Sequence, residues 1–417
     1  MPNISTSNTN SIYKYTAQIV TTFENDDNPL TIDFLRFKSI VIDYNYSNFN
    51  FPLIYCNVNL RVEDQLKLAK NQKNGTVVFT LQKYMENSDM PGLKMNVIEA
   101  SCIYFVPQDI GKINEKIEIT DPNKTDDLGD NVTIGLIALD LVNLNKTVTN
   151  QMIKEGTMSS VLYYLLQSRP VLIEPLTYNT KIENFAIPPL NSLSKTVSYL
   201  NNYHTFYDTV YRFFMDFDMT YLMSTSGLGV KKKGEECNII KFVLHRQYDE
   251  KNMEGMNYEI INGMYVIDCS GSYSTMSDST DSSKAFSAYG GITASGDILE
   301  EETGTRDSNS PVRAKTVNIR VPNNNTNLIR NMTTDEANSQ ILLSIVKNKI
   351  DGSIITPNKQ IYVDASAVYG EKYTGVYLLD RKREVYLREG EGFAMSVMLS
   401  TKRIADQSNF HIVASLM

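Results

Sequence analysis

The chain has 417 residues, a formal net charge of −8 and a pI of about 5.2. This acidic balance argues against a surface that binds nucleic acid, because such a surface needs clustered lysine and arginine to neutralise phosphates. The length predicts about two to four domains, and the 25 tyrosines and 16 phenylalanines favour strands, since aromatic side chains suit a pleated, half-buried surface.

The first quarter of the chain has a strand pattern. Residues 1–11 are polar and are predicted to be disordered. From 12 to 108, β-branched and aromatic residues alternate with polar ones, which predicts antiparallel strands that form a first tube-like β-barrel. Within this segment, 63–75 places leucines between charged residues and ends on Gly75, so we expect a short surface helix there.

Residues 109–254 mix helical and strand patterns and are predicted to form a central α+β domain. The expected elements are a strand at 132–142, a helix at 157–168 with Thr157 or Ser159 as N-cap, an extended segment at 184–193, a helix at 200–217, and strands at 219–226 and 238–247. The last two strands are joined by Gly227–Gly234, which we expect to be a hairpin turn.

The helix at 200–217 is predicted from the densest aromatic run in the chain. Its large apolar residues recur every three or four positions and so lie on one helical face: Leu200, Tyr203, Phe206, Tyr207, Val210, Phe213, Phe214 and Phe217. We expect this face to belong to the core.

Residues 255–406 are predicted to form a second tube-like β-barrel, followed by a C-terminal tail at 407–417. Segment 270–311 is rich in Ser, Thr, Gly and Asp, so we expect a mobile insertion there. The other expected elements are a strand at 314–322, a helix at 333–352, and strands at 359–366, 373–389 and 392–403. The predicted fold class is α+β, mostly β, with two tube-like antiparallel barrels, each carrying a helix, around a mixed centre.

The aromatic run also contains the best candidates for chemistry. On a helix, His204 and Asp208 would lie one turn apart and could pair, but no nucleophile accompanies them, so we favour a structural contact. Asp216 and Asp218 have the spacing of a DxD metal motif, yet two positions apart on a helix they face different directions. If the helix ends at this point, both could cap it or approach basic groups.

No other residues form a catalytic or metal-binding pattern. Cys56, Cys102, Cys237 and Cys269 lie far apart and form no CxxC pair, so we expect buried thiols. Glu300–Glu302 and the "EGEGF" stretch at 389–393 could suggest the carboxylate pair of a glycosidase, but both lie in polar turns. We therefore predict no enzyme activity, no catalytic residue, no cofactor and no metal. We also expect no secretory signal and no membrane insertion.

Two stretches resemble a known family. Ile187-Pro188-Pro189 leads into the predicted helix, Asp216-Phe217-Asp218 forms an acidic step, and a strand with the pair Tyr221-Leu222 follows. Near the C-terminus a Gly-x-Tyr strand, Gly375–Tyr377, precedes a hairpin and a final strand that opens near Phe393. This order resembles the baseplate hub family of contractile phage tails, related to late-control D proteins and to the N-terminal part of type VI secretion spike proteins.

The resemblance implies a homotrimer in which two barrels per chain form a pseudo-sixfold ring. That ring would adapt a hexameric tail tube to a trimeric spike, around a lumen that passes tape-measure protein and DNA without binding DNA specifically. The implied partners are the tail tube or a tube-adjacent protein, the tape-measure protein and a separate spike chain. The implied location is the virion baseplate, assembled in the cytoplasm of the host bacterium. Alternatives are a tube terminator, a capsid-associated protein or a tail-associated cell-wall hydrolase.

Overall fold

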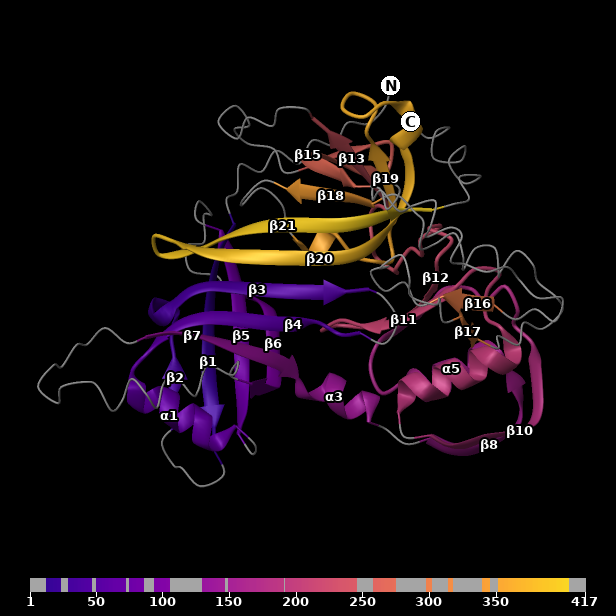
Figure 1. The fold of residues 1–417 in the computed structure, drawn as a ribbon, viewed down its shortest axis with the longest axis horizontal. Helices are drawn as coiled ribbons and strands as arrows, with labels where there is room; N and C mark the ends of the chain where they lie inside the picture. Colours follow the sequence, from indigo (N-terminus) through magenta and orange to yellow (C-terminus); the bar gives the residue numbers. More distant parts are fainter. Residues whose placement is uncertain are drawn as a thin grey trace, which may run out of the picture.

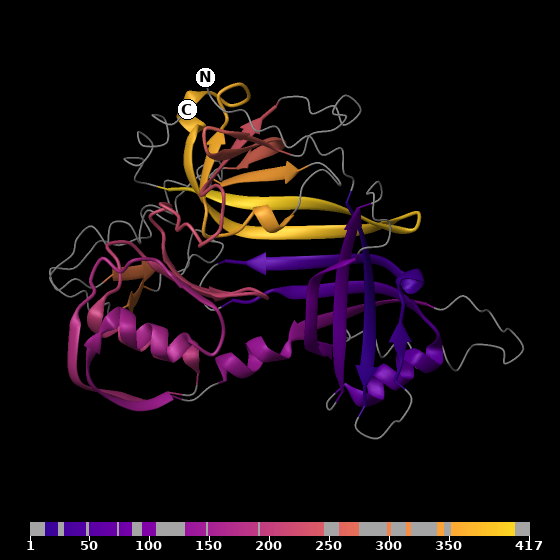
Figure 2. The same cartoon turned by 180° about the vertical axis from the view of Figure 1, so that it is seen from behind.

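The computed structural model describes residues 13–23, 29–46, 50–72, 75–85, 94–105, 130–146, 149–190, 192–245, 258–274, 298–301, 314–317, 340–345 and 352–404. Figure 1 shows three groups of elements: N-terminal strands, C-terminal strands stacked on them, and a central group with helices beside both. The same arrangement is seen from behind in Figure 2.

The N-terminal group follows the alternating pattern of its sequence. In β4 (Leu53–Leu60) every second side chain is buried, from Ile54 to Leu60, as expected for strands that cover a core with one face. The predicted helix is confirmed as α1 (Val62–Asn71), which buries Leu68. The other elements of this group are β1 (Tyr13–Thr22), β2 (Thr31–Ile32), η1 (Phe34–Arg36), β3 (Phe37–Asn45), β5 (Thr76–Met85) and β6 (Met95–Phe105).

The central group contains two small sheets and three helices. Its elements are α3 (Leu139–Asn145), β8 (Thr149–Thr157), α4 (Met158–Leu166), β9 (Val171–Ile173), β10 (Lys181–Leu190), α5 (Leu193–His204), β11 (Tyr211–Met215) and β12 (Thr220–Ser224). The strand before them in the chain, β7 (Asp130–Ala138), pairs with β4 and β6 of the N-terminal group. Helix α4 confirms the predicted helix, and Thr157 is its N-cap in a capping box with Ser160. The predicted extended segment around Pro188-Pro189 is confirmed as part of β10.

The C-terminal group is built around one long hairpin. Strands β20 (Gly375–Glu389) and β21 (Gly392–Arg403) confirm the two predicted final strands and the hairpin between them. The remaining elements are β13 (Ile239–Leu244), β14 (Glu259–Ile261), β15 (Met264–Ser274), β18 (Gln340–Ile345), η4 (Gly352–Ile354), β19 (Gln360–Asp364) and η5 (Glu371–Tyr373). Strands β16 (Ile298–Glu301) and β17 (Ala314–Val317) pair with each other in a separate sheet, beside the central group in Figure 1.

Strand pairing joins the N- and C-terminal groups into one large sheet that closes on itself twice. The first strand ring runs β3, β4, β7, β6, β5, β1, β21, β20 and back to β3. The second strand ring runs β13, β19, β20, β21, β18, β15 and back to β13. The hairpin β20–β21 belongs to both rings, as Figure 1 shows in yellow. The fold is therefore mostly β with ring-like pairing, and the tube shape of the two predicted barrels stays a prediction.

The shared hairpin changes partner at a β-bulge. Before Asp380, β20 pairs with β19, for example Tyr377 with Ile361. From Arg381 onward it pairs with β3, and the register against β21 shifts between Leu379 and Arg381. Because a bulge bends a strand and increases its twist, this single irregularity lets one strand leave the second ring and enter the first.

Four local predictions are wrong in whole or in part. The strand expected at 132–142 ends at Ala138, and the residues after it form helix α3, which buries Leu141. The helix expected at 200–217 ends at His204 because Thr205 has a φ of 40°, and the aromatic residues after it form β11. The helix expected at 333–352 is replaced, where the structure describes it, by strand β18 between β15 and β21. Gly227–Gly234 is not a hairpin turn, because it connects β12 of a small sheet to β13 of the large one.

The predicted domain bounds stay a prediction. Strands β7 and β13 come from 109–254, the predicted centre, yet both pair within the rings. Segments 1–11 and 407–417 and most of the insertion 270–311 lie outside the described residues, although β15 runs to Ser274 and β16 lies within that insertion. Among the described helices, none combines the length and apolar character that crossing a membrane requires.

Candidate functional site

The aromatic run divides between a helix end and a hairpin. His204 is the last residue of α5, where its ring lies 5.1 Å from the ring of Phe185 and its Nδ1 lies 3.4 Å from Thr180 Oγ1. Burial lowers the pKa of His204. Asp208 follows in the connection to β11, not one helical turn later, so the helix that would pair it with His204 is absent. The structural interpretation of His204 fits this packing.

Asp216 and Asp218 lie in the tight turn of the β11–β12 hairpin. Asp216 Oδ1 accepts hydrogen bonds from the backbone N–H groups of Asp218, at 2.9 Å, and of Met219, at 2.7 Å. Arg169 Nη2 donates to the carbonyls of Asp216 and Phe217 at 3.0 and 2.6 Å. The Asp216 carboxylate therefore holds the turn, as short acidic side chains often do.

The other candidates lie apart from this hairpin. His245 Nε2 lies 2.7 Å from Asp268 Oδ1 in a pair that is about half exposed, between β13 and β15. The four cysteines are buried and free, as predicted. Glu389 ends β20 and Glu391 lies in the turn before β21. Glu300 and Glu301 lie on strand β16 rather than in the polar turn expected there, and Glu302 and His411 lie outside the described residues. The described part of the chain contains no group of three or more His, Cys, Asp or Glu that could hold a metal.

The β11–β12 hairpin connects the central group to both strand rings. Toward the first ring, the Met215 N–H donates to the Asn50 carbonyl at 3.0 Å, and the ring of Phe214 lies 5.3 Å from that of Tyr46. Toward the shared hairpin, Arg212 Nη1 donates to the carbonyl of Leu379 at 3.0 Å. Arg212 is only 6% exposed. A buried guanidinium thus binds the backbone of β20 immediately before its bulge.

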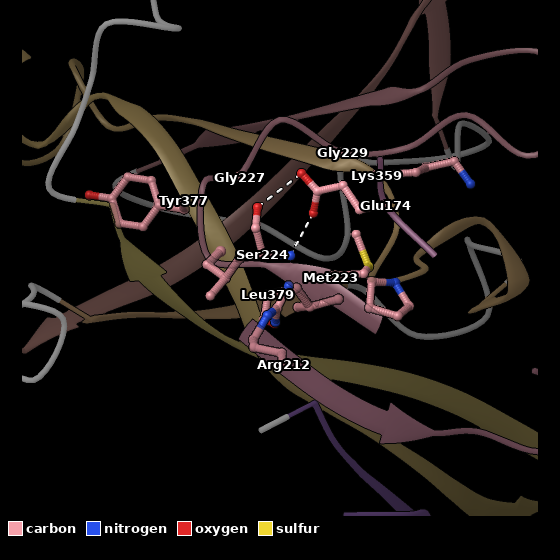
Figure 3. A pocket seen from close by; sticks show the side chains of 11 residues that line it. Glu174, Arg212, Met223, Ser224, Gly227, Gly229, Lys359, Tyr377 and Leu379 are labelled. Carbon is pink, nitrogen blue, oxygen red and sulfur yellow. Dashed lines mark hydrogen bonds between the residues drawn. The ribbon is translucent and has the colours of Figure 1, made fainter. Parts of the chain in front are cut away.

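A buried carboxylate supports the other side of this hairpin. Glu174, which follows β9, is 8% exposed and accepts hydrogen bonds from Ser224 N–H at 2.6 Å and Ser224 Oγ at 2.9 Å. Figure 3 shows both bonds, with Arg212, Tyr377 and Leu379 around them. The cavity between these side chains measures about 10 Å³. That volume holds about one water molecule, so this cavity has no room for a larger molecule.

A second buried cluster lies on the part of β20 that belongs to the first ring. Lys382 Nζ lies 2.9 Å from Glu384 Oε1, and the two side chains are 7% and 5% exposed. Tyr386 Oη donates to Glu384 Oε2 at 2.9 Å, and Lys382 Nζ donates to the Gly352 carbonyl at 3.3 Å. Lys382 also lies 4.2 Å above the ring of Tyr44 on β3. This cluster joins β20, β3 and η4 where the two rings meet.

We name the residues of these two clusters and the hairpin turn between them the ring junction: Glu174, Arg212, Asp216, Ser224, Lys382 and Glu384. Only Asp216 was a candidate from sequence. The sequence does contain an indication of the second cluster. In "DRKREVYL", Lys382, Glu384 and Tyr386 occupy alternate positions of a strand and therefore share one face. A lysine and a glutamate on the face of a buried tyrosine suggest a buried ion pair.

Fold similarity to solved structures extends over almost the whole chain at low identity. A tail protein from Neisseria meningitidis MC58 has 8% identity and a TM-score of 0.42, covering 95% of this chain and 98% of that one. A lidded PdpA-VgrG complex from Francisella has 9% identity and a TM-score of 0.39, covering 95% of this chain and 53% of that one. The E. coli c3393 protein is described as a component of the type VI secretion system with structural similarity to the T4 bacteriophage tail proteins gp27 and gp5. It has 7% identity and a TM-score of 0.40, covering 93% of this chain and 77% of that one.

No curated protein matches the chain. One family model matches residues 4–404, nearly the entire sequence, and its description is "Bacteriophage PBS1 gene 109 protein". The chain belongs to the Bacteriophage PBS1 gene 109 protein family.

Proposed function

We propose that the protein is the structural hub of a phage tail baseplate. In this proposal it forms a trimeric ring that adapts a hexameric tail tube to a trimeric central spike and surrounds the channel for DNA and tape-measure protein. It is located in the virion, with a separate spike chain and the tail tube as its partners. Membership in a bacteriophage protein family supports the viral setting.

The observation that carries the proposal is the double closure of the large sheet. One chain presents two strand rings that share β20 and β21. Three chains arranged around an axis would therefore present six rings, which is the symmetry match that an adapter between sixfold and threefold partners requires. A closed ring also leaves few free strand edges, which suits a permanent part of an assembly.

The ring junction supports a structural role rather than catalysis. Its buried charges bind one another or backbone groups: Lys382 pairs with Glu384, Arg212 binds the Leu379 carbonyl, and Glu174 binds Ser224. The cavity among them holds about one water molecule. Such a network stabilises one relative position of the rings and gives no room for a reacting molecule.

The net charge of −8 fits a channel through which DNA passes. Like charges repel, so a predominantly acidic protein resists nonspecific binding of phosphates. This charge belongs to the chain as a whole and favours passage of DNA without specific recognition.

The test is assembly with partners. The purified chain has a mass of 47.2 kDa, and light scattering should give three times that mass, alone or when the tube and spike proteins of the same phage are added. The trimer should bind both partners at once, at opposite ends. A monomer that binds neither partner would overturn the proposal, and a chain that binds only the tube would favour a tube terminator instead.

A further inference from the structure

Strand β8 has one edge without a partner. In the described part of the chain, β8 pairs only with β10, in a sheet of two strands. The opposite edge therefore presents backbone N–H and C=O groups that no described strand uses. Such an edge is a template on which another extended chain can add.

A groove lies along this edge, between β8 and α4. Its volume is about 580 Å³, and it is lined by Met152–Glu155 of β8 and by Ser160, Val161 and Tyr164 of α4. Consecutive residues of a strand point to opposite faces. Because four in a row line the groove, it runs along the backbone edge rather than over one face of the sheet.

The groove is closed at one end and open at the other. At the closed end β8 turns into α4, and a Cβ atom on Gly156 would lie 3.1 Å from Ser160 Oγ, so helix and strand are in contact there. At the open end Met152 is 72% exposed and Tyr164 is 56% exposed. Two large apolar side chains thus face solvent on the two walls of one groove, which marks an interaction surface.

Charge at the groove favours an acidic occupant. Glu155 is already paired, because Lys181 Nζ lies 2.7 Å from its Oε1. Lys154 is exposed and forms no ion pair with any described residue. Met152 and Lys154 share one face of β8. A strand added beside β8 would therefore place one residue next to Met152 and, two positions away on the same face, another next to Lys154.

We propose that this groove binds an extended segment of another protein as an added strand, with an apolar residue between Met152 and Tyr164 and a carboxylate beside Lys154. Helix α4 has nine residues and is about 13 Å long at 1.5 Å per residue. An extended chain covers that length with about four residues at 3.3 Å each. The occupant is thus a short acidic and apolar segment of a partner chain, a binding role additional to that of a ring adapter.

A selection of random heptapeptides displayed on a carrier, with the purified full-length chain as bait, tests this directly. The enriched peptides should carry an apolar residue and, two positions away on the same strand face, Asp or Glu. A synthetic copy of the strongest should bind the chain in fluorescence anisotropy, and methylation of its alternate backbone nitrogens should abolish binding, since an added strand needs its N–H groups. Enrichment of basic peptides, or binding that survives methylation, would overturn the proposal.

Matched variants locate the binding. Tyr164→Ala and Lys154→Glu should each weaken the peptide at least about tenfold, the loss expected when one buried contact or one charge pair is removed. Tyr203→Ala and Lys195→Glu are the controls, because Tyr203 is 55% exposed on α5 and Lys195 is exposed on the same helix, both outside the groove. Equal effects in both sets, or no enriched peptide, would refute the proposal. A self-association that Tyr164→Ala abolishes would refute it in favour of a second copy as the occupant.

Discussion

Lys382 and Glu384 lie two residues apart on β20 and form an ion pair of 2.9 Å with both side chains almost completely buried. Residues at i and i+2 of a strand share a face, so this pair has the same orientation as Tyr386 beside it. The pair lies on the strand that both rings share, after the bulge at which that strand changes partner. The junction of the rings therefore depends on buried charges as well as on apolar packing.

Replacing one member of the pair should cost much more than replacing an exposed pair. Glu384→Gln leaves the Lys382 ammonium buried without a counter-charge, and we expect a loss of about 3–5 kcal/mol in the free energy of unfolding. Urea denaturation followed by circular dichroism measures it. Glu155→Gln, which removes an exposed partner of Lys181, is the control and should leave the midpoint unchanged. A Glu384→Gln midpoint equal to that of the control would contradict the buried pair.

Gly352 should tolerate no side chain while Glu384 is present. A Cβ atom at 352 would lie 2.7 Å from Glu384 Oε1. Gly352→Ala should therefore destabilise the chain by about 1–3 kcal/mol through overpacking. In a Glu384→Ala background the same substitution should cost clearly less, because the clashing carboxylate is gone. Additive losses in this double-mutant cycle would show that the two residues do not touch.

Substitutions at the two aspartates of the hairpin turn should change the stability of the chain in opposite directions. Asp216→Ala removes the acceptor of two backbone hydrogen bonds and should cost about 1–3 kcal/mol, whereas Asp216→Asn retains a side-chain oxygen there and should cost less. Burial, and then the Asp216 carboxylate, raises the pKa of Asp218.

The raised pKa of Asp218 determines how its carboxyl group affects the stability of the fold at each pH. The folded state then favours the protonated acid, so its contribution is fully present below the unfolded pKa of 3.8 and is lost as pH rises through the folded value. Asp218 is exposed, so solvent screens part of this effect, and Asp218→Asn should raise the melting temperature only slightly at pH 7. An equal loss of stability in Asp216→Ala and Asp218→Asn would be inconsistent with these roles.

Glu235 should contribute to acid sensitivity. Burial opposes its ionisation, but hydrogen bonds from the Lys232 N–H, from Lys359 and from Asn358 together lower its pKa below 4.5. A lowered carboxyl pKa stabilises the fold above the unfolded value, and that contribution is lost as pH falls through the folded value.

The comparison of Glu235→Gln with the unmodified chain tests this. The substitution should reduce the melting temperature at pH 7 and should change it little at pH 3, where the unmodified chain has lost most of the same contribution. Differential scanning calorimetry at both pH values provides the measurement. An equal reduction at the two pH values would show that ionised Glu235 has no part in the acid response.

Local periodicity predicted those elements whose own sequence decides their structure. In β4 every second residue from Ile54 to Leu60 is apolar and buried, and α4 begins at its predicted cap, Thr157. The long strands β20 and β21 were likewise predictable, because their β-branched and aromatic residues continue over many positions.

The predictions of secondary structure were wrong where contacts between distant parts of the chain determine the local structure. Residues 211–215 satisfy both a helical and a strand period, and the positive φ of Thr205 that ends α5 has no sequence signature. Around 341–345 a short apolar run became a strand because β15 and β21 lie on either side of it. The sharing of β20 between the rings could not be predicted either. It depends on pairs such as Arg383 with Asp43, which lie 340 residues apart.

The central claim is that three copies of this chain form a ring with six strand rings around a channel. A cryo-electron microscopy map of the intact phage tail tests it most directly. The account predicts three copies at the tube–spike boundary, with both strand rings of each chain beside the channel and β20–β21 shared between them. A map that places the chain elsewhere in the virion, or with one strand ring turned away from the channel, would contradict it.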